Sequence, residues 1–211
     1  MAHKNPTIVI VDDDLAVRTA VRLLLRSVNF TVEMYCSGDE FLSAFNPDLP
    51  GCLLLDIRMP GISGLALQKQ LNAQHSTTPV IFMTGHGDVP MAVEAMQNGA
   101  FDFIQKPFHD DKLLETTNRA LKKDEETRHS IHQHDAIRRR LQSLTPRERE
   151  VLALITAGKA NKVVAGDLSV SQRTVEIHRS RVMEKMQASS LAHLVRMVVA
   201  IEGDTSKLTG S

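Results

Sequence analysis

The chain has 211 residues, of which 42% are hydrophobic and 24% charged, so it fits two modest folded domains and cannot be disordered throughout. Its net charge of zero hides an asymmetry: acids outnumber bases over residues 1–123, and bases outnumber acids over residues 138–196, which favours a polyanionic partner for the second half. No apolar run approaches the roughly 18–20 residues of a membrane span, and the N-terminal apolar stretch is too short for a signal peptide, so we expect a cytoplasmic protein without membrane contact.

The first half alternates short β-branched runs with stretches of helical periodicity. Five apolar runs predict strands at residues 7–11, 30–35, 52–55, 80–83 and 101–104. Apolar residues at helical spacing predict helices over about residues 17–28, 39–45, 65–74, 90–98 and 110–121. This alternation predicts an α/β fold, a doubly wound five-stranded parallel sheet with helices on both faces. In such a sheet, reactive groups gather at the carboxyl ends of the strands.

Residues 122–140 are polar and contain neither Gly nor Pro, which predicts a solvated helical linker. For the basic run Arg138–Arg140 a solvated face is favoured over direct contact with DNA. After Leu141 the helical periodicity returns in four short stretches. The first of these helices should begin with Thr145 as N-cap, and Glu148 should complete a capping box.

This pattern divides the chain into three segments: a first domain of residues 1–123, a helical linker of residues 124–140, and a small all-α domain of residues 141–205. The cysteines, Cys36 and Cys52, form neither a metal-ligand spacing nor a disulfide framework, and we expect both to be buried as small hydrophobic residues. The linker contains three histidines without Cys or carboxylate partners at ligand spacing, so no metal site is expected at His129, His132 and His134.

The strongly polar residues of the first half fall at the ends of predicted strands. Three acids, Asp12–Asp14, follow the first strand, and Asp56 follows the third. Thr84 follows the fourth strand and Lys106 the fifth. Converging carboxylates require a cation, and oxygen ligands suit Mg²⁺; a lysine and a hydroxyl added to them make a site for a phosphoryl group. Helix capping is an equal alternative for Asp14, but it explains neither Asp56 nor Lys106.

The runs IVIVDDD, LLLDIRMPGISG, FMTGHGD and FDFIQKPF span about residues 5–122 in order. They resemble the receiver domain of bacterial response regulators, a flavodoxin-like fold with strand order 2-1-3-4-5. The resemblance implies that a sensor histidine kinase phosphorylates Asp56. It also implies a Mg²⁺ ion held directly by Asp13, Asp56 and the main-chain carbonyl of Arg58, and through water by Asp12.

The same resemblance implies how the phosphate is read. Thr84 and Lys106 would contact its oxygens, Lys106–Pro107 would be a cis peptide, and Phe103 would be the aromatic switch that rotates when Thr84 moves inward. The surface of residues 90–98 and 101–104 would then change shape and become the contact of a homodimer. The candidates for this contact, whose helical spacing also suits an ordinary core, are Met91, Val93 and Met96.

The segment from TPREREVL through AGKANKVVAGDLSVS to RTVEIHRSRVMEKM resembles a LuxR/NarL-type helix-turn-helix over about residues 144–197, and GHGDVPMAVEAM indicates the FixJ branch. The resemblance implies a positioning helix at residues 161–168. A recognition helix at residues 171–186 would lie in the major groove, with Ser171 as its N-cap.

Individual DNA contacts follow from the residue types on these helices. Lys162 and Arg173 are expected on phosphates, Arg179 on guanine or phosphate, and Glu176 on a cytosine amino group, unless Glu176 pairs with a neighbouring arginine. The remaining DNA-contact candidates, of which His178 is equally a packing residue, are Thr174, His178 and Ser180.

These features predict a two-component transcription regulator that binds promoter DNA as a homodimer when phosphorylated. In the FixJ-like case, the unphosphorylated receiver masks the DNA-binding domain; activation is favoured, and RNA polymerase is a further candidate partner. The only enzymatic steps expected are its own Mg²⁺-dependent phosphotransfer and dephosphorylation. A phosphotransferase acting on metabolites is disfavoured, because Arg58 stands where a second acid is needed. A constitutive DNA binder with a vestigial receiver is disfavoured by the retained acids, hydroxyl and lysine.

Overall fold

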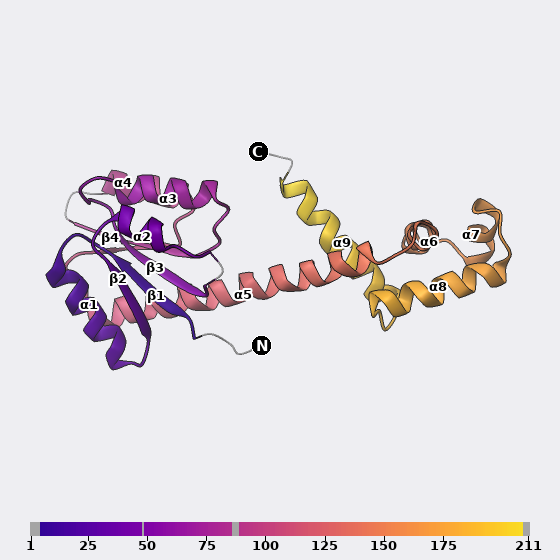
Figure 1. Ribbon diagram of the computed structural model, residues 1–211, viewed down its shortest axis with the longest axis horizontal. Coiled ribbons are helices and arrows are strands. Elements are labelled where there is room, and N and C mark those ends of the chain that lie inside the picture. The colour runs from indigo at the N-terminus through magenta and orange to yellow at the C-terminus, as the bar shows by residue number, and fades with distance from the viewer. Residues whose placement is uncertain (1–4, 48, 86–88, 209–211) are drawn as a thin grey trace. The chain divides into compact units, whose positions relative to one another are not determined.

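The computed structural model describes residues 5–47, 49–85 and 89–208 (Figure 1). By its internal contacts the chain divides into residues 1–128, here unit 1, and residues 129–211, here unit 2. Each unit has its own hydrophobic core. Within the described ranges, no helix combines the length and the apolar character that a membrane crossing requires.

The described residues of unit 1 form the predicted five-stranded parallel sheet. Its strands are β1 (Thr7–Val11), β2 (Thr31–Tyr35), β3 (Gly51–Asp56), β4 (Val80–Thr84) and β5 (Asp102–Gln105). They lie in the order β2-β1-β3-β4-β5, which confirms the predicted topology. All of β3 is buried, as expected for a central strand covered on both faces.

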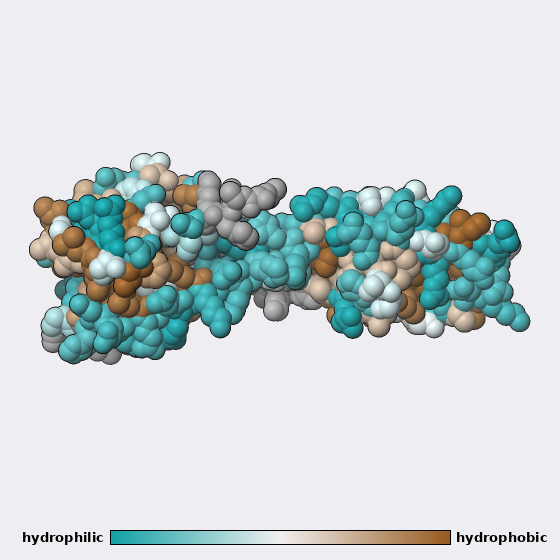
Figure 2. All heavy atoms as spheres, turned by 90° about the horizontal axis from the view of Figure 1, so that it is seen from below, coloured by the Kyte–Doolittle hydropathy of each residue, from teal (hydrophilic) through white to brown (hydrophobic). Residues whose placement is uncertain are grey.

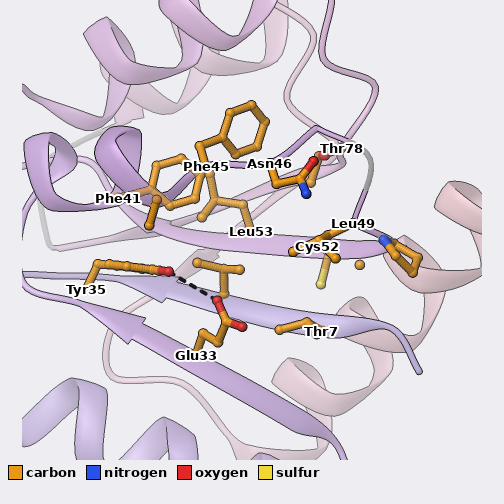
Figure 3. A pocket seen from close by; sticks show the side chains of 14 residues that line it. Thr7, Glu33, Tyr35, Phe41, Phe45, Asn46, Leu49, Cys52, Leu53 and Thr78 are labelled. Atoms are coloured by element: carbon orange, nitrogen blue, oxygen red, sulfur yellow. Dashed lines mark hydrogen bonds between the residues drawn. The ribbon is translucent and has the colours of Figure 1, made fainter. Parts of the chain in front are cut away.

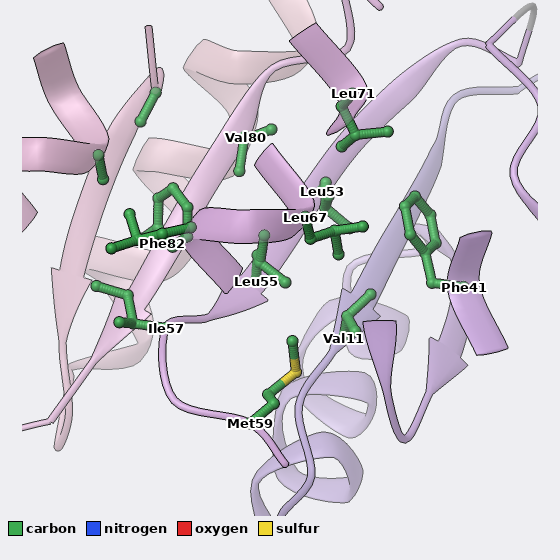
Figure 4. Close-up of a cluster of buried hydrophobic side chains, with 13 residues drawn as sticks. Val11, Phe41, Leu53, Leu55, Ile57, Met59, Leu67, Leu71, Val80 and Phe82 are labelled. Carbon is green, nitrogen blue, oxygen red and sulfur yellow. The ribbon is translucent and has the colours of Figure 1, made fainter. Parts of the chain in front are cut away.

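Helices cover both faces of this sheet (Figure 1). They are α1 (Leu15–Ser27), α2 (Gly38–Ala44), α3 (Gly64–Ala73), α4 (Val89–Gln97) and α5 (Asp110–Gln142). On one face, Leu55 and Phe82 from the strands meet Leu67 and Leu71 of α3 (Figure 4). On the other, Cys52 and its neighbours pack against α1 and α5. The strand side chains alternate between two cores, so the sheet itself is held rigidly.

A cavity of about 40 Å³ lies in unit 1 among side chains of β1, β2, β3 and the α2 segment (Figure 3). Phe41, Phe45 and Leu53 line it, and beside them the Tyr35 hydroxyl donates to Glu33 at 3.1 Å. This volume is far below the roughly 300–1,000 Å³ of a typical small-molecule pocket.

The prediction that both cysteines are buried is correct for Cys52 and wrong for Cys36. Cys36 follows the end of β2, an edge strand, so no neighbouring strand covers its side chain. Its amide donates to the Glu40 carboxylate at 2.7 Å. A hydrogen bond to Glu40 raises the pKa of the Cys36 thiol, which disfavours the thiolate form.

The helix α5 is longer than predicted and includes the polar linker segment. Its middle section is hydrophilic on the face seen in Figure 2, as expected for a solvated helix. Two side chains of this segment, both within unit 1, nevertheless bind the main chain around the start of β3. Buried Asp124 accepts from the Gly51 amide at 2.8 Å, and Arg128 donates to the Leu49 carbonyl at 2.6 Å and to Asp124 at 2.9 Å. These contacts attach α5 to the start of β3.

Unit 2 contains the end of α5 and the predicted four helices, α6 (Pro146–Thr156), α7 (Asn161–Asp167), α8 (Gln172–Met186) and α9 (Leu191–Leu208). The capping box of Thr145 and Glu148 is present, and Ser171 caps α8 as predicted. The core buries Val151, Val175, Val182 and other apolar residues from all four helices, and the end of α5 packs against it.

Candidate acidic site and nucleic-acid interface

The carboxyl edge of the sheet brings together four of the predicted site residues. Asp12 follows β1, Asp56 and Thr84 end β3 and β4, and Lys106 follows β5. The Lys106 ammonium donates to Asp12 Oδ2 at 2.7 Å and to Asp56 Oδ1 at 2.5 Å. Asp12, Asp56 and Thr84 are 1%, 7% and 3% exposed. The crevice therefore holds two nearly buried carboxylates bridged by one ammonium group.

Main-chain groups fix this arrangement. Asp12 accepts from the Asp14 amide at 2.9 Å, and Asp56 Oδ2 accepts from the Arg58 amide at 2.8 Å. The Lys106 amide donates to the Thr84 carbonyl at 2.6 Å, which places the Thr84 residue beside the lysine. Lys106–Pro107 is cis, as expected. Because backbone and side chains constrain one another, the site is organised by the fold itself.

Burial and the pairing with Lys106 have opposite effects on the pKa of Asp56. Burial raises the pKa of the Asp56 carboxyl above its ordinary value, the Lys106 hydrogen bond and charge partly offset this, and the Asp12 charge adds to the rise. Burial alone would lower the pKa of the Lys106 ammonium, but its bonds to Asp12 and Asp56 outweigh this and raise it. The Arg18 guanidinium, whose Nη1 donates to the Asp12 carbonyl at 2.5 Å, adds positive charge beside Asp12. The oxygens of the two acids are nevertheless of the type that suits an additional cation.

The structure assembles only part of the predicted Mg²⁺ set. Asp12 and Asp56 converge, whereas Asp13 is exposed. Asp14 accepts from the Ala16 amide at 2.7 Å, so it is the N-cap of α1. Within the described ranges, no three His, Cys, Asp or Glu side chains form a group that could hold a metal. The two converging carboxylates supply oxygen donors of the type that Mg²⁺ prefers.

A shallow groove runs from the acidic site over α4 and β5. It is lined by Thr84, Gly85, Ala92, Val93, Met96, Gln97, Phe103 and Gln105. Phe103, Val93 and Met96 are 44%, 50% and 41% exposed, whereas Met91 is partly buried and packs against the core. The Met/Val stripe therefore divides between core and surface. His86, Gly87 and Asp88 of the GHGD motif lie outside the described residues.

The outward face of α8 carries several of the predicted DNA contacts. Arg173, Glu176 and Ser180 are exposed, as is Lys162 on α7. Thr174 is half-buried, and its hydroxyl lies 2.8 Å from the Ser171 hydroxyl at the start of the helix. Arg173, Thr174 and Glu176 thus lie in the first half of α8, and Ser180 lies just beyond it.

Two more of the predicted DNA contacts are half-buried. Arg179, which was expected on guanine or phosphate, is half-buried and donates to Asn161 Oδ1 at 3.0 Å, so it ties α8 to the start of α7. His178 is half-buried, with its Nδ1 buried and lacking a hydrogen-bond partner among the described residues, which favours the packing interpretation.

The sequence reasoning missed Ile177 as a surface residue. It is 47% exposed on α8. Each residue advances about 100° around a helix, so Ile177, two positions after buried Val175, faces the opposite side. The helical spacing alone could have revealed this. Ile177 therefore places an exposed apolar side chain between Arg173 and Ser180 on the otherwise polar surface of α8.

Two family models match the chain: a response regulator receiver domain over residues 8–118, and the luxR family of bacterial regulatory proteins over residues 142–198. The transcriptional regulatory protein FixJ of Rhizobium meliloti (strain 1021) is 48% identical over 195 residues, which are 92% of this chain and 95% of that protein. FixJ of Bradyrhizobium diazoefficiens is 44% identical over 192 residues, covering 91% of this chain and 94% of the relative. The solved structure of the response regulator StyR has a TM-score of 0.85 and 43% identity, covering 92% of this chain and 98% of that one.

Proposed function

The chain belongs to the FixJ-like response regulators, which join a receiver domain to a LuxR-type DNA-binding domain, and we propose that phosphorylation of Asp56 controls DNA binding by its α8. It is a transcription regulator and not a classical enzyme. Its receiver implies a sensor kinase as partner and its second domain implies DNA. The observation that carries the proposal is the bridge from Lys106 to nearly buried Asp12 and Asp56, with Thr84 beside it.

The proposed phosphotransfer uses the groups already in place. A carboxylate oxygen of Asp56 attacks the phosphorus of a kinase phosphohistidine in line, the new O–P bond forms as the P–N bond breaks, and the imidazole leaves with the bonding electrons. The Arg58 amide and the Lys106 ammonium hold the carboxylate and offset the phosphoryl charge. Mg²⁺, held directly by Asp13, Asp56 and the Arg58 carbonyl and through water by Asp12, would neutralise further charge.

The groove links the acceptor to a surface that can respond. In the proposed switch, the Thr84 hydroxyl bonds a phosphoryl oxygen, and Phe103, exposed at the other side of the groove, fills the space that Thr84 vacates. Val93 and Met96 would then lie on a reshaped face that pairs two copies of the chain. Two linked copies would bring two α8 helices to pseudo-palindromic half-sites, where RNA polymerase could be contacted.

For DNA recognition, we propose that Lys162, Arg173 and Thr174 contact the backbone, and that Glu176 and Ser180 meet base edges. Ile177 would contact a thymine methyl group, which is the apolar feature of the major groove. Arg179 and His178 would position α8 instead, because one binds Asn161 and the other is half-buried. Since chromosomal DNA is the partner, the cytoplasm is the proposed compartment.

The domain division is part of the proposal. Boundaries after residues 123 and 140 were predicted from composition. The contacts of Asp124 and Arg128 with unit 1 support a receiver that ends at Arg128, and the packing of Ile137 against the second core supports a DNA-binding domain that begins before it. The exposed part of the linker would then be residues 129–133.

The test is phosphate-dependent DNA binding by the full chain. Acetyl phosphate with Mg²⁺ should label the wild type stoichiometrically and tighten its binding to duplexes recovered from a randomised pool. Asp56→Asn should abolish both effects, whereas Glu115→Gln, which removes an exposed acid from α5, should leave both intact. Undiminished labelling and tightening in Asp56→Asn would refute Asp56 as the acceptor. Absence of labelling in the wild type would instead favour a vestigial receiver.

A further inference from the structure

The C-terminal end of α8 requires partners for its last carbonyl groups. A helix leaves its final four carbonyls without intrahelical donors and carries partial negative charge there. The amides of Gln187 and Ala188 turn back to the carbonyls of Glu184 and Met183, each at 2.9 Å, with Gln187 in a left-handed conformation at φ 54°. The Met186 carbonyl depends on a donor from elsewhere.

That donor is Arg140, in the last turn of α5. Its Nη2 donates to Gln187 Oε1 at 2.5 Å, and its Nη1 lies 3.5 Å from the Met186 carbonyl oxygen. The guanidinium therefore places a positive charge and two donors at the negative end of α8. Ile137, about one turn before Arg140, and Leu141, the residue after it, pack against the core that buries Met186. Apolar and polar contacts thus join the ends of the two helices.

A second contact reinforces the same junction. Lys185, in the last turn of α8, donates to Glu148 Oε2 at 2.7 Å and lies 3.4 Å from the carbonyl of Ser143, which directly follows α5. Glu148 is 2% exposed and also accepts from the Thr145 amide at 2.8 Å. The end of α8 is therefore held from two sides, whereas its first turns carry the exposed Arg173 and Glu176.

We propose that Arg140 is a positioning residue for DNA recognition, because it fixes the C-terminal end of α8 to α5 and so sets the angle at which α8 presents its first turns to bases. The 15 residues of α8 span about 22 Å at a rise of roughly 1.5 Å per residue. A rotation of about 5° at the fixed end displaces the other end by about 2 Å. That shift exceeds the tolerance of a base-edge hydrogen bond, whereas long phosphate-binding side chains can follow it.

The inference rests on the proposed role of α8 and is tested with the full chain on two duplexes, one recovered from a randomised pool and one of scrambled sequence. Arg140→Met should lower the ratio of specific to non-specific affinity about tenfold. It should leave the dependence of log Kd on log salt unchanged, because no phosphate contact is lost. A variant that is merely destabilised would lose both affinities together. A salt slope reduced by about 0.9 would instead mark Arg140 as a phosphate contact and overturn the proposal.

Two further variants make the test specific to the junction. Gln187→Gly removes the acceptor side chain while retaining a residue that tolerates the left-handed conformation, so it should reproduce the loss even if Arg140→Met folds poorly. The double variant should lose no more of the specificity ratio than the more strongly affected single variant does. Losses that add in the double variant would overturn the proposal.

Arg139→Met is the matched control, because it removes the same charge from an exposed neighbouring position and should leave the specificity ratio within about twofold. An equal loss in this control would show that linker charge matters and not the junction. Failure of the wild type to distinguish the two duplexes would refute the proposed function itself, whereas an unchanged ratio in Arg140→Met would refute only the role of Arg140.

Discussion

Glu148 is a nearly buried carboxylate that helps to organise unit 2 by staying ionised. The hydrogen bond from Lys185 and that from the Thr145 amide lower the pKa of Glu148 to about 2, from a value of 4.5 without partners. Because the folded-state pKa is below the unfolded value, its contribution to stability is complete above pH 4.5 and is lost as pH falls toward 2. The acid therefore joins the start of α6 to the end of α8 across the neutral pH range.

We expect Glu148→Gln to destabilise unit 2 at pH 7 and to differ progressively less from the wild type as pH falls below 4.5. Hydrogen exchange of α6 and α8 amides in the full chain measures this effect. Glu150→Gln, which breaks the exposed pair with Arg147, is the control and should have little effect at any pH. A Glu148→Gln penalty that does not change between pH 7 and pH 3 would contradict the assigned ionisation.

At the scale of residues, the sequence predicts which side chains meet at the sheet edge better than it predicts which side chains form hydrogen bonds with one another. Asp56, Thr84 and Lys106 could be placed together because parallel strands bring their carboxyl ends to one edge. The Arg179 contact with Asn161 could not be predicted, because it depends on how closely two short helices cross. Cys36 was misplaced because the general tendency of free cysteines to be buried was applied to it, although the predicted strand order already put the preceding strand at the edge of the sheet.

At the scale of elements, α7 is a short helix with a glycine that neither packing nor backbone conformation requires. A Cβ atom added at Gly166 meets nothing within 4 Å. Gly158, just before α7, also has open space, but its φ is +83°, a conformation that other residues adopt only with strain. Both glycines have room for a Cβ atom, but only Gly158 has a positive φ. Comparing alanine substitutions at the two positions therefore isolates the effect of backbone conformation on stability.

Gly166→Ala should therefore stabilise unit 2 by about 0.5–1 kcal/mol, because it reduces the freedom of the unfolded chain and raises helix propensity. Gly158→Ala should destabilise it by about 1 kcal/mol or more, since the left-handed conformation is retained at a cost. Urea unfolding of both variants measures the difference. A loss of stability in Gly166→Ala would contradict the open space around the added Cβ atom.

The elements themselves were largely predictable, because apolar periodicity matches each strand and helix to within a few residues. The exception is α5, which was expected to leave the receiver near residue 121. Its polar surface gave no indication that Asp124 and Arg128 bind the start of β3, since these bonds join residues more than seventy positions apart. A charged residue in a hydrophilic helix looks the same in sequence whether it is solvated or buried.

At the scale of the whole molecule, the exposed apolar residues of α4 should determine the state of association. Phosphorylated wild type should sediment as a dimer, and phosphorylated Val93→Glu should remain monomeric, because dimerisation would bury an unpaired charge. Asp56 labelling should be unaffected. Leu23→Glu, at a site on α1 that is 61% exposed, is the control and should still dimerise. Dimerisation of phosphorylated Val93→Glu would place the contact elsewhere.

The anchoring of α5 by Asp124 and Arg128 has a consequence for building hybrid regulators. A junction cut at residue 123 would strip the receiver of the carboxylate that holds the Gly51 amide and leave that amide without its acceptor. A junction between residues 129 and 136 keeps this bond with the input module and keeps Ile137 and Arg140 with the output module. Exchange of sensory specificity between relatives is therefore least disruptive within this one stretch of about two helical turns.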